Sequence, residues 1–248
     1  MANSYFQFKQ FTVHQDRCAM KVTTDGCLFG AWITEQVRSM KSDVRGGPDD
    51  QLLDIGTGTG LLSLMVAQKT TALIDAIEID NDAFEQAKEN AANSPWSERI
   101  NVIHANVKEF PFSKQYDVIF SNPPFYENEL KSGNSKKNRA HHDESLLLDE
   151  LLCIIKNNLQ PGGRFFLVLP YKRNEEIDTA VKKNNLCVCH KVLVRQSVNH
   201  NYFRIMIRGE HQQEKSDRYI TTQLAIKNEK QEYTPEFIGL LKDYYLYL

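Results

Sequence analysis

Short apolar runs alternate with longer segments of helical length through the central two thirds of the chain. The runs at 51–55, 72–80, 100–105, 116–121 and 164–170 have the length of buried strands. Segments of helical length follow at 60–69, 82–93, 145–159 and 174–183. Strands that alternate with helices in this way predict an α/β fold, a mainly parallel, doubly wound sheet with helices on both faces.

The two ends of the chain have other patterns. Residues 5–13 alternate apolar and polar positions and predict a short strand or hairpin, and a helical pattern opens at Asp25 and Gly26. After residue 183, three β-like segments follow with no helix between them, which predicts two or three antiparallel strands at one edge of the sheet. Pro161 is expected to stop the preceding helix, and Pro235 to begin the last one.

Length and composition are those of an ordinary globular protein. The chain has 248 residues, 41% hydrophobic and 25% charged. We expect one domain over 1–248, with a lead-in at 1–48, a core at 49–210 and a C-terminal strand and helix at 211–248. No apolar run is long enough for a membrane span, the start lacks a secretory pattern, and five cysteines without metal-ligand spacing indicate a reducing cytoplasm.

A glycine-rich loop stands between the first strand of the core and its helix. Asp54 precedes Gly56, Gly58 and Gly60, and Glu78 ends the next strand, where a carboxylate can accept both hydroxyls of a ribose. A pyrophosphate would rely on the positive helix N-terminus, but Asp54 adds negative charge there. The loop therefore favours a cationic or zwitterionic ligand such as S-adenosylmethionine over NAD.

The fourth strand of the core ends in a second candidate site, Asn122-Pro123-Pro124-Phe125. Two prolines cannot continue a strand, and both fix φ, so the backbone is stiff where ligands bind in open α/β sheets. The side-chain carbonyl of Asn122 and the backbone carbonyl of Pro123 can accept the two hydrogens of an amine. Phe125 offers a face on which a planar base can stack. This pattern predicts methyl transfer to an amino nitrogen.

A longer pattern carries a resemblance to a known family. The stretch FKQFTVHQDRCAMKVTTDGCLFGAW, together with DIGTGTG and SNPPF, is similar to the bacterial tRNA1(Val) adenine N6-methyltransferases, which modify the adenosine immediately 3′ of the anticodon. The resemblance runs from about Phe6 to Arg208. It implies a Rossmann-like class I methyltransferase fold, S-adenosylmethionine as cofactor and the anticodon stem-loop of tRNA as partner.

The resemblance also implies roles for single residues. The target adenine would be bound by Asn122, Pro123, Pro124 and Phe125. The cofactor would be held by Asp54, Gly56, Gly58, Gly60 and Glu78, and closed over by Lys21, Thr23, Thr24 and Asp25. The third strand of such enzymes usually ends in an aspartate that accepts from the adenine amine of the cofactor. Here the matching residue is Asn106, whose amide oxygen can still accept.

A net charge of −2 at first opposes a nucleic-acid partner, but the charge is unevenly spread. Residues 179–209 contain no acidic residue and several cations, and a second basic stretch follows the candidate catalytic motif. We expect phosphate contacts from Lys131, Lys136, Lys137, Arg139, Arg195 and Arg204. No metal is expected, since His104, His141 and His142 form no ligand pattern, and we expect a monomer.

Other functions remain open from the sequence. The same chemistry could act on an rRNA guanine or on a release-factor glutamine, although the short lead-in argues against the latter. A non-catalytic RNA-binding protein of the same fold and an NAD oxidoreductase are further alternatives. The Cys187-x-Cys189 pair is interpreted as buried strand thiols rather than as a metal or redox site.

Overall fold

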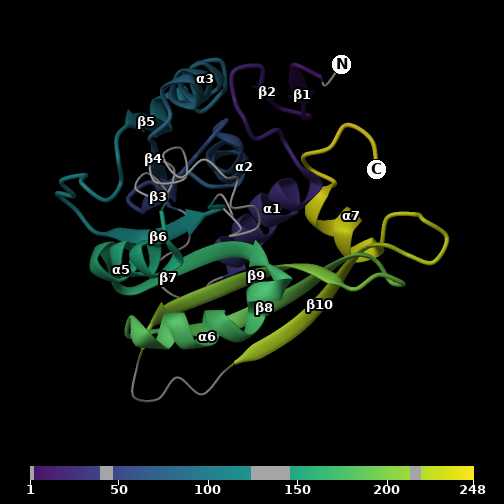
Figure 1. The fold of residues 1–248 in the computed structure, drawn as a ribbon. Helices are drawn as coiled ribbons and strands as arrows, with labels where there is room; N and C mark the ends of the chain where they lie inside the picture. The colour runs from purple at the N-terminus through teal and green to yellow at the C-terminus, as the bar shows by residue number, and fades with distance from the viewer. Residues whose placement is uncertain (1–2, 40–46, 124–145, 213–218) are drawn as a thin grey trace, which may run out of the picture.

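A computed structural model describes residues 3–39, 47–123, 146–212 and 219–248. A mixed sheet runs through the molecule in the order β10-β8-β9-β7-β6-β3-β4-β5 (Figure 1). Its strands are β3 (Gln51–Ile55), β4 (Leu73–Glu78), β5 (Ile100–His104), β6 (Tyr116–Ser121), β7 (Leu159–Pro170), β8 (Leu186–Ser197), β9 (Tyr202–His211) and β10 (Ile220–Lys227). The five core strands β3 to β7 are all parallel, which confirms the predicted α/β class.

The C-terminal strands confirm one expectation and correct another. β9 is antiparallel to both of its neighbours, β7 and β8, as predicted. β10, however, pairs in parallel with β8. The chain reverses direction twice between β8 and β10, so β8 and β10 point in the same direction. Because β9 already pairs with β7 and β8, β10 pairs with the free edge of β8, in parallel.

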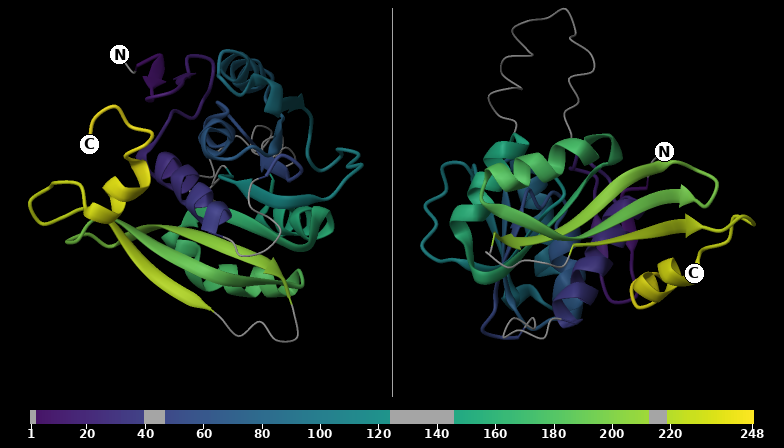
Figure 2. Two further views of the ribbon diagram at one scale, coloured as in Figure 1. Left: turned by 180° about the vertical axis from the view of Figure 1, so that it is seen from behind. Right: turned by 90° about the horizontal axis from the view of Figure 1, so that it is seen from below.

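Helices cover both faces of this sheet (Figure 2). The buried side chains of α1 (Thr24–Ser39), α2 (Leu61–Lys69) and α7 (Pro235–Leu241) form one core with the sheet, and those of α5 (Leu148–Asn158) and α6 (Asn174–Lys183) form another. Strand β7 serves both, since Phe166 lies in the first core and Phe165 in the second. Burial on both faces explains why the second half of this strand, residues 165–170, is a continuous apolar run. No helix in the described ranges is long and apolar enough to cross a bilayer.

The two ends of the chain lie side by side. The predicted N-terminal hairpin is present as β1 (Tyr5–Gln7) and β2 (Thr12–His14). Phe8 forms a β-bridge with Tyr245, and the backbone of Lys9 donates to that of Tyr244 at 2.8 Å. Helix α7 begins as predicted, with Pro235 in its first turn and the Thr234 side chain capping it.

The prediction that Pro161 stops a helix is wrong in detail. Helix α5 already ends at Asn158, and β7 begins at Leu159, so Pro161 lies inside the first part of the strand. The pairing with β6 shifts register between Tyr116 and Val118, and Gly162 has φ +84°. A side chain at Gly163 would come within 2.9 Å of the Asp117 carbonyl oxygen, so glycine is required by this close approach.

Candidate active site

The glycine loop lies between β3 and α2, at the carboxyl end of the parallel sheet. Gly56 and Gly58 have φ angles of +71° and +57°, in the left-handed region where only glycine is unstrained. The Gly56 N–H donates to the Ile77 carbonyl at 2.9 Å, which fixes the loop against the end of β4. Apart from its chain neighbours, no atom of the described residues lies within 4 Å of a Cβ atom added to Gly56 or Gly58, so the loop borders open space there. It therefore forms a cradle that a ligand can approach closely.

Asp54 lies beneath this cradle and is completely buried. Its Oδ2 accepts hydrogen bonds from the Thr57 hydroxyl at 2.6 Å and the Ser63 hydroxyl at 2.7 Å. Its Oδ1 is buried and has no hydrogen-bond partner among the described residues. Burial raises the pKa of Asp54 to about 6, against the opposing effect of the two hydroxyls. At neutral pH the carboxylate thus retains an unsatisfied acceptor, which suits a cationic hydrogen-bond donor.

Glu78 ends β4 and holds the cradle from its other side. One carboxylate oxygen accepts from the Gly58 N–H at 2.8 Å. The other accepts from the backbone of Ile79 at 2.9 Å and of Asp80 at 3.0 Å. These donors fix the carboxylate, and the one remaining lone pair, on the oxygen that faces Gly58, can still accept from a ligand hydroxyl.

The N-terminal lead-in is fastened to the cradle by α3 (Asn81–Ala92). The amide nitrogen of Asn90 donates to the carbonyls of His14 at 2.8 Å and Thr59 at 2.9 Å, and its oxygen accepts from the His14 N–H at 2.9 Å. Lys21 donates to the Gln15 carbonyl, so in this structure it serves the lead-in itself. One asparagine side chain therefore joins the lead-in to the glycine loop.

The start of α1 brings the lead-in next to the second candidate site. The Thr23 hydroxyl accepts from the Gly26 N–H at 3.2 Å. A Cβ atom on Gly26 would lie 3.4 Å from the Leu61 side chain and 3.9 Å from the Asn122 amide nitrogen. Helix α1, the beginning of α2 and Asn122 therefore meet at one place.

Asn122 follows the last residue of β6 and is half-buried, and Pro123 is buried. The Ser121 hydroxyl donates to the Ile55 carbonyl at 2.7 Å, which ties the end of β6 to the end of β3 beside the cradle. Pro124 and Phe125 lie outside the described residues. The structure thus brings Asn122 and Pro123 to the edge that also holds Asp54.

The chain matches the model of the methyltransferase small domain over residues 37–188. Curated relatives named tRNA1(Val) (adenine(37)-N6)-methyltransferase match over nearly their whole length. The protein of Dyadobacter fermentans is 42% identical over 246 residues, covering 98% of both chains, and that of Parabacteroides distasonis is 39% identical over 249 residues, covering 99% of both. The chain belongs to the tRNA1(Val) (adenine(37)-N6)-methyltransferase family.

Solved structures agree on the fold. A protein of Listeria monocytogenes assigned to the class I S-adenosylmethionine-dependent methyltransferases aligns with a TM-score of 0.61 at 16% identity, covering 92% of this chain and 71% of its own. A protein of Agrobacterium tumefaciens predicted to be an O-methyltransferase aligns with a TM-score of 0.59 at 17% identity, covering 88% and 95%. The Rossmann-like class I methyltransferase fold expected from the sequence is confirmed.

The cradle fits the cofactor of this methyltransferase family, S-adenosylmethionine. The orphaned Oδ1 of Asp54 can accept from its ammonium group, and the open space over Gly56 and Gly58 leaves room for its methionine part. Glu78 stands at the end of β4, where its one free lone pair can accept from a ribose hydroxyl. Asn106 lies in the turn after β5, and its side-chain oxygen accepts from the Lys108 N–H at 3.1 Å. Its contact with the cofactor adenine stays a prediction.

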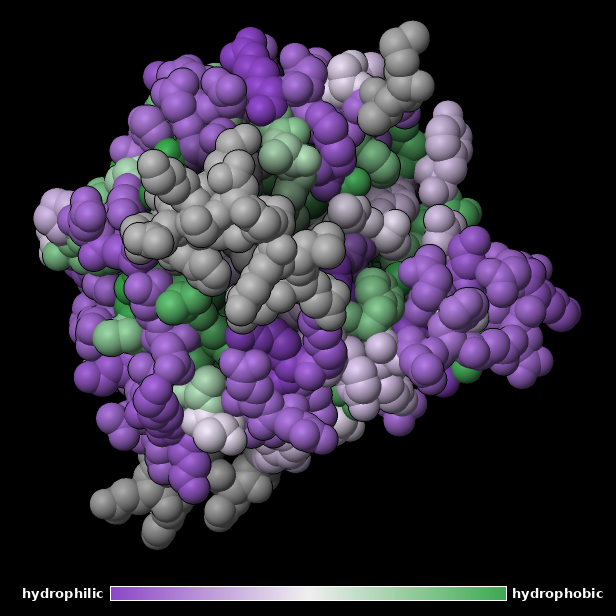
Figure 3. Space-filling view, viewed as in Figure 1, coloured by the Kyte–Doolittle hydropathy of each residue, from purple (hydrophilic) through white to green (hydrophobic). Residues whose placement is uncertain are grey.

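Two residues that were expected to contact separate ligands, Asp25 from the family resemblance and Arg204 from the charge pattern, bind each other. The Arg204 guanidinium, expected to meet RNA, donates to the Asp25 carboxylate, expected to meet the cofactor, at 2.7 Å. The tip of Arg195 donates to the Val198 carbonyl at 2.9 Å and lies 5.9 Å from the centre of the Tyr202 ring. The remaining RNA candidates, Lys131, Lys136, Lys137 and Arg139, lie outside the described residues. Hydrophilic side chains cover most of the described surface on the face shown in Figure 3.

Sequence reasoning missed three residues of this methyltransferase site: Ser63, Asn90 and Ser121. Each is a buried polar residue in an apolar environment, and the side chain of each forms a hydrogen bond to the cradle or to the strand ends beside it. The polar interruptions of otherwise apolar runs at Ser63 and Ser121 were the available signal. Asn90 gave none, because polar residues are frequent along its helix and nothing in the pattern sets this one apart.

The Cys187–Cys189 pair lies at the other end of β8, away from the cradle. The two thiols and the Glu210 carboxylate come within 4.8 Å of one another, an arrangement that could hold a metal ion. Glu210 is already paired with Arg164 at 2.7 Å, and burial raises the pKa of Cys189 to about 12. The ion pair of Glu210 with Arg164 and the raised pKa of Cys189 both disfavour the binding of a metal cation here.

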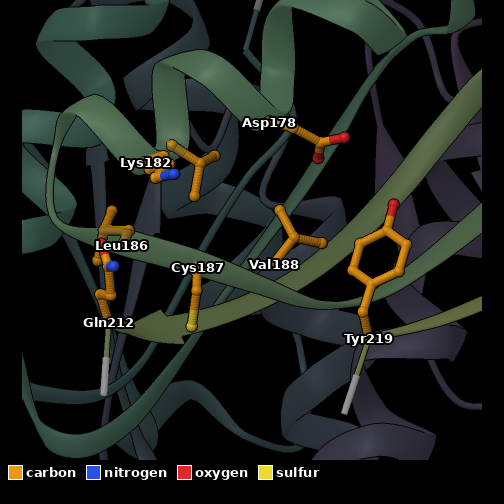
Figure 4. A pocket seen from close by; sticks show the side chains of 8 residues that line it. Asp178, Lys182, Leu186, Cys187, Val188, Gln212 and Tyr219 are labelled. Atoms are coloured by element: carbon orange, nitrogen blue, oxygen red, sulfur yellow. The ribbon is translucent and has the colours of Figure 1, made fainter. Parts of the chain in front are cut away.

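Cys187 also lines a cavity of about 260 Å³ beside α6, which Figure 4 shows with Tyr219 at its rim.

Proposed function

We propose that this protein transfers a methyl group from S-adenosylmethionine to N6 of the adenosine 3′ of the anticodon in tRNA1(Val). The observation that carries the proposal is full-length similarity to curated relatives of that name, at 42% identity for one of them. The position of Asn122 beside a cradle suited to the cofactor supports it. A tRNA substrate agrees with the reducing, cytoplasmic setting that the cysteines indicate.

The amine to be methylated is a poor nucleophile, because its lone pair is delocalised into the adenine ring. Asn122 Oδ1 and the Pro123 carbonyl would accept its two hydrogens and turn the nitrogen lone pair towards the cofactor. The bond from Ser121 to Ile55 holds this pair of acceptors at a fixed position relative to the cradle. The bound cofactor supplies the electrophilic methyl group. The chain's own contribution is then mainly positioning.

Asp54 and Glu78 would orient the cofactor from two sides. Asp54 would accept from its ammonium group and Glu78 from its ribose hydroxyls, while the lead-in fastened by Asn90 closes the site. Closure excludes water and strengthens the electrostatic contacts inside. Methyl transfer would leave a positive charge on the amine nitrogen and the cofactor as its neutral thioether, and the nitrogen would then lose one proton to solvent.

The proposal is tested with unmodified tRNA1(Val), radiolabelled cofactor and mapping of the product by mass spectrometry. We expect N6-methyladenosine next to the anticodon, and none on a tRNA with guanosine at that position. Asn122→Ala should lower kcat by about a hundredfold or more, with unchanged cofactor affinity. Asn157→Ala, an exposed position on α5, is the control and should retain full activity. Near-normal turnover by Asn122→Ala at saturating cofactor would contradict the assigned role.

A further inference from the structure

Two tyrosines and an arginine gather at the carboxyl end of β7 and β8, and neither the family resemblance nor the site described above uses the tyrosines. The Tyr171 and Tyr202 rings lie with their centres 5.2 Å apart at 46°. The Arg195 guanidinium lies 5.9 Å from the centre of the Tyr202 ring. All three side chains are half-buried, so each presents part of its surface to solvent. Together they make an aromatic and cationic surface.

This surface stands on the same edge of the sheet as Asn122. Ser121 of β6 is level with Leu167 of β7, and Tyr171 follows Pro170, the last residue of β7. Three residues along a strand and one strand across place Tyr171 on the order of 11 Å from Asn122. A base one or two nucleotides from a target held at Asn122 can reach that far.

The surface is also rigid. Tyr202 and Arg195 are register partners on β9 and β8, and the Arg195 guanidinium is held by its bond to the Val198 carbonyl. The pairing skips Phe203, a β-bulge that turns Tyr202 and Arg204 to opposite faces of the sheet, Tyr202 towards Tyr171 and Arg204 towards Asp25. A surface fixed in this way loses little side-chain entropy when a ligand stacks on it.

The hydroxyl groups set these tyrosines apart from those of the core. Tyr116 donates to Asp75 at 2.9 Å and Tyr244 donates to the Met65 carbonyl at 3.1 Å. Among the described residues, neither Tyr171 nor Tyr202 has such a hydroxyl partner. Both the rings and the hydroxyl groups of Tyr171 and Tyr202 are therefore free to contact a ligand.

We propose that Tyr171, Tyr202 and Arg195 form a subsite that stacks an unpaired base of the RNA loop flanking the target adenosine. Aromatic rings with an adjacent guanidinium are the chemistry that binds unpaired bases without regard to their identity. The proposal rests on the proposed function, since it needs an RNA loop at Asn122. It assigns part of the RNA affinity to aromatic rings at the strand ends instead of to lysines.

The test compares alanine and phenylalanine at both tyrosines. Tyr171→Ala and Tyr202→Ala should each raise the KM and Kd for the anticodon stem-loop by about tenfold, with kcat and cofactor affinity nearly unchanged, because a stacked base is lost. Tyr171→Phe and Tyr202→Phe keep the ring and should bind as the wild type does. Thermal denaturation of every variant confirms that the alanine variants are folded.

The matched control is a second tyrosine with a cation over its ring. Tyr219 is 52% exposed and lies 5.6 Å from the Lys191 ammonium, but at the start of β10, near the amino end of β8 (Figure 4). Tyr219→Ala should leave RNA binding unchanged. In addition, 5-iodouridine placed at each loop pyrimidine in turn should cross-link to Tyr171 or Tyr202 on irradiation.

The outcomes separate this proposal from the one above. If the wild type methylates the tRNA but both alanine variants bind it unchanged and the cross-links fall elsewhere, the subsite is refuted and the function stands. If the wild type neither methylates nor binds the stem-loop, the proposed function fails and this subsite fails with it. A loss of RNA binding in Tyr219→Ala equal to that in the other alanine variants would also refute the subsite.

Discussion

The buried carboxyl group of Asp54 predicts a pH dependence of cofactor binding. Its pKa in the free protein is about 6, raised from 3.8 by burial, and its ionised form is the one that can accept from an ammonium group. About nine tenths of the group is ionised at pH 7 and about one tenth at pH 5. The Kd for the cofactor should therefore rise about tenfold over this interval. The Kd rises at low pH because acid protonates Asp54 and so removes the ionised form that binds the ammonium group.

The same shift acts on stability in the free protein. Since the folded-state pKa lies above the ordinary value, ionisation of Asp54 costs stability as pH rises through about 6. Between pH 5 and pH 7 the free energy of unfolding should fall by about 1 kcal/mol from this group alone. The difference between wild type and Asp54→Asn isolates it from the other carboxyl groups.

Calorimetric titration with S-adenosylhomocysteine, a stable product of the cofactor, measures the effect from pH 5 to pH 7. Asp54→Asn is the control, because its amide oxygen can still accept from Thr57 and Ser63 but cannot titrate. The variant should bind more weakly, with a Kd that is constant over the interval. A wild-type Kd that does not change between pH 7 and pH 5 would refute the reasoning about Asp54.

Three further perturbations test the site. Asn90→Ala removes the hydrogen bonds to His14 and Thr59 and should lower the free energy of unfolding, measured by urea denaturation, by about 2–3 kcal/mol. An unchanged free energy of unfolding would show that contacts other than those of Asn90 hold the lead-in in place. Gly58→Ala adds a Cβ to the cradle at a positive φ and should cost about 1–2 kcal/mol of stability and weaken cofactor binding at least tenfold by calorimetry, an effect that Gly239→Ala on α7 should not show. Asp25→Asn and Arg204→Gln, alone and combined, should give a coupling energy of about 1 kcal/mol in a double-mutant cycle of thermal unfolding, and strictly additive losses would dismiss the ion pair as a stabilising contact.

The sequence predicted the sheet and the motif positions because both depend on local pattern. The strand ends that carry Asp54, Glu78 and Asn122 could be found from apolar runs and from glycine and proline punctuation. Because the strands are parallel, their carboxyl ends lie at one edge of the sheet, so the proximity of these three residues could be predicted from the sequence.

Contacts between distant segments could not be found in that way. The pairing of Asp25 with Arg204 joins residues 179 positions apart, and it depends on a bulge that no residue type at 203 announces. Whether β10 is parallel or antiparallel to its neighbour likewise depends on which strand still has an unpaired edge, here β8. Both features depend on which distant segments meet in the folded structure, so they cannot be predicted from composition or residue spacing.

The three hydrogen bonds of Asn90 have a consequence for how ligands influence one another. They make the chain around His14 and the loop around Thr59 a single cooperative unit, although 45 residues separate the two in sequence. A cofactor that orders the loop therefore also orders the lead-in. Linkage is reciprocal, so if RNA contacts the lead-in, it would raise cofactor affinity by the same factor by which the cofactor raises RNA affinity.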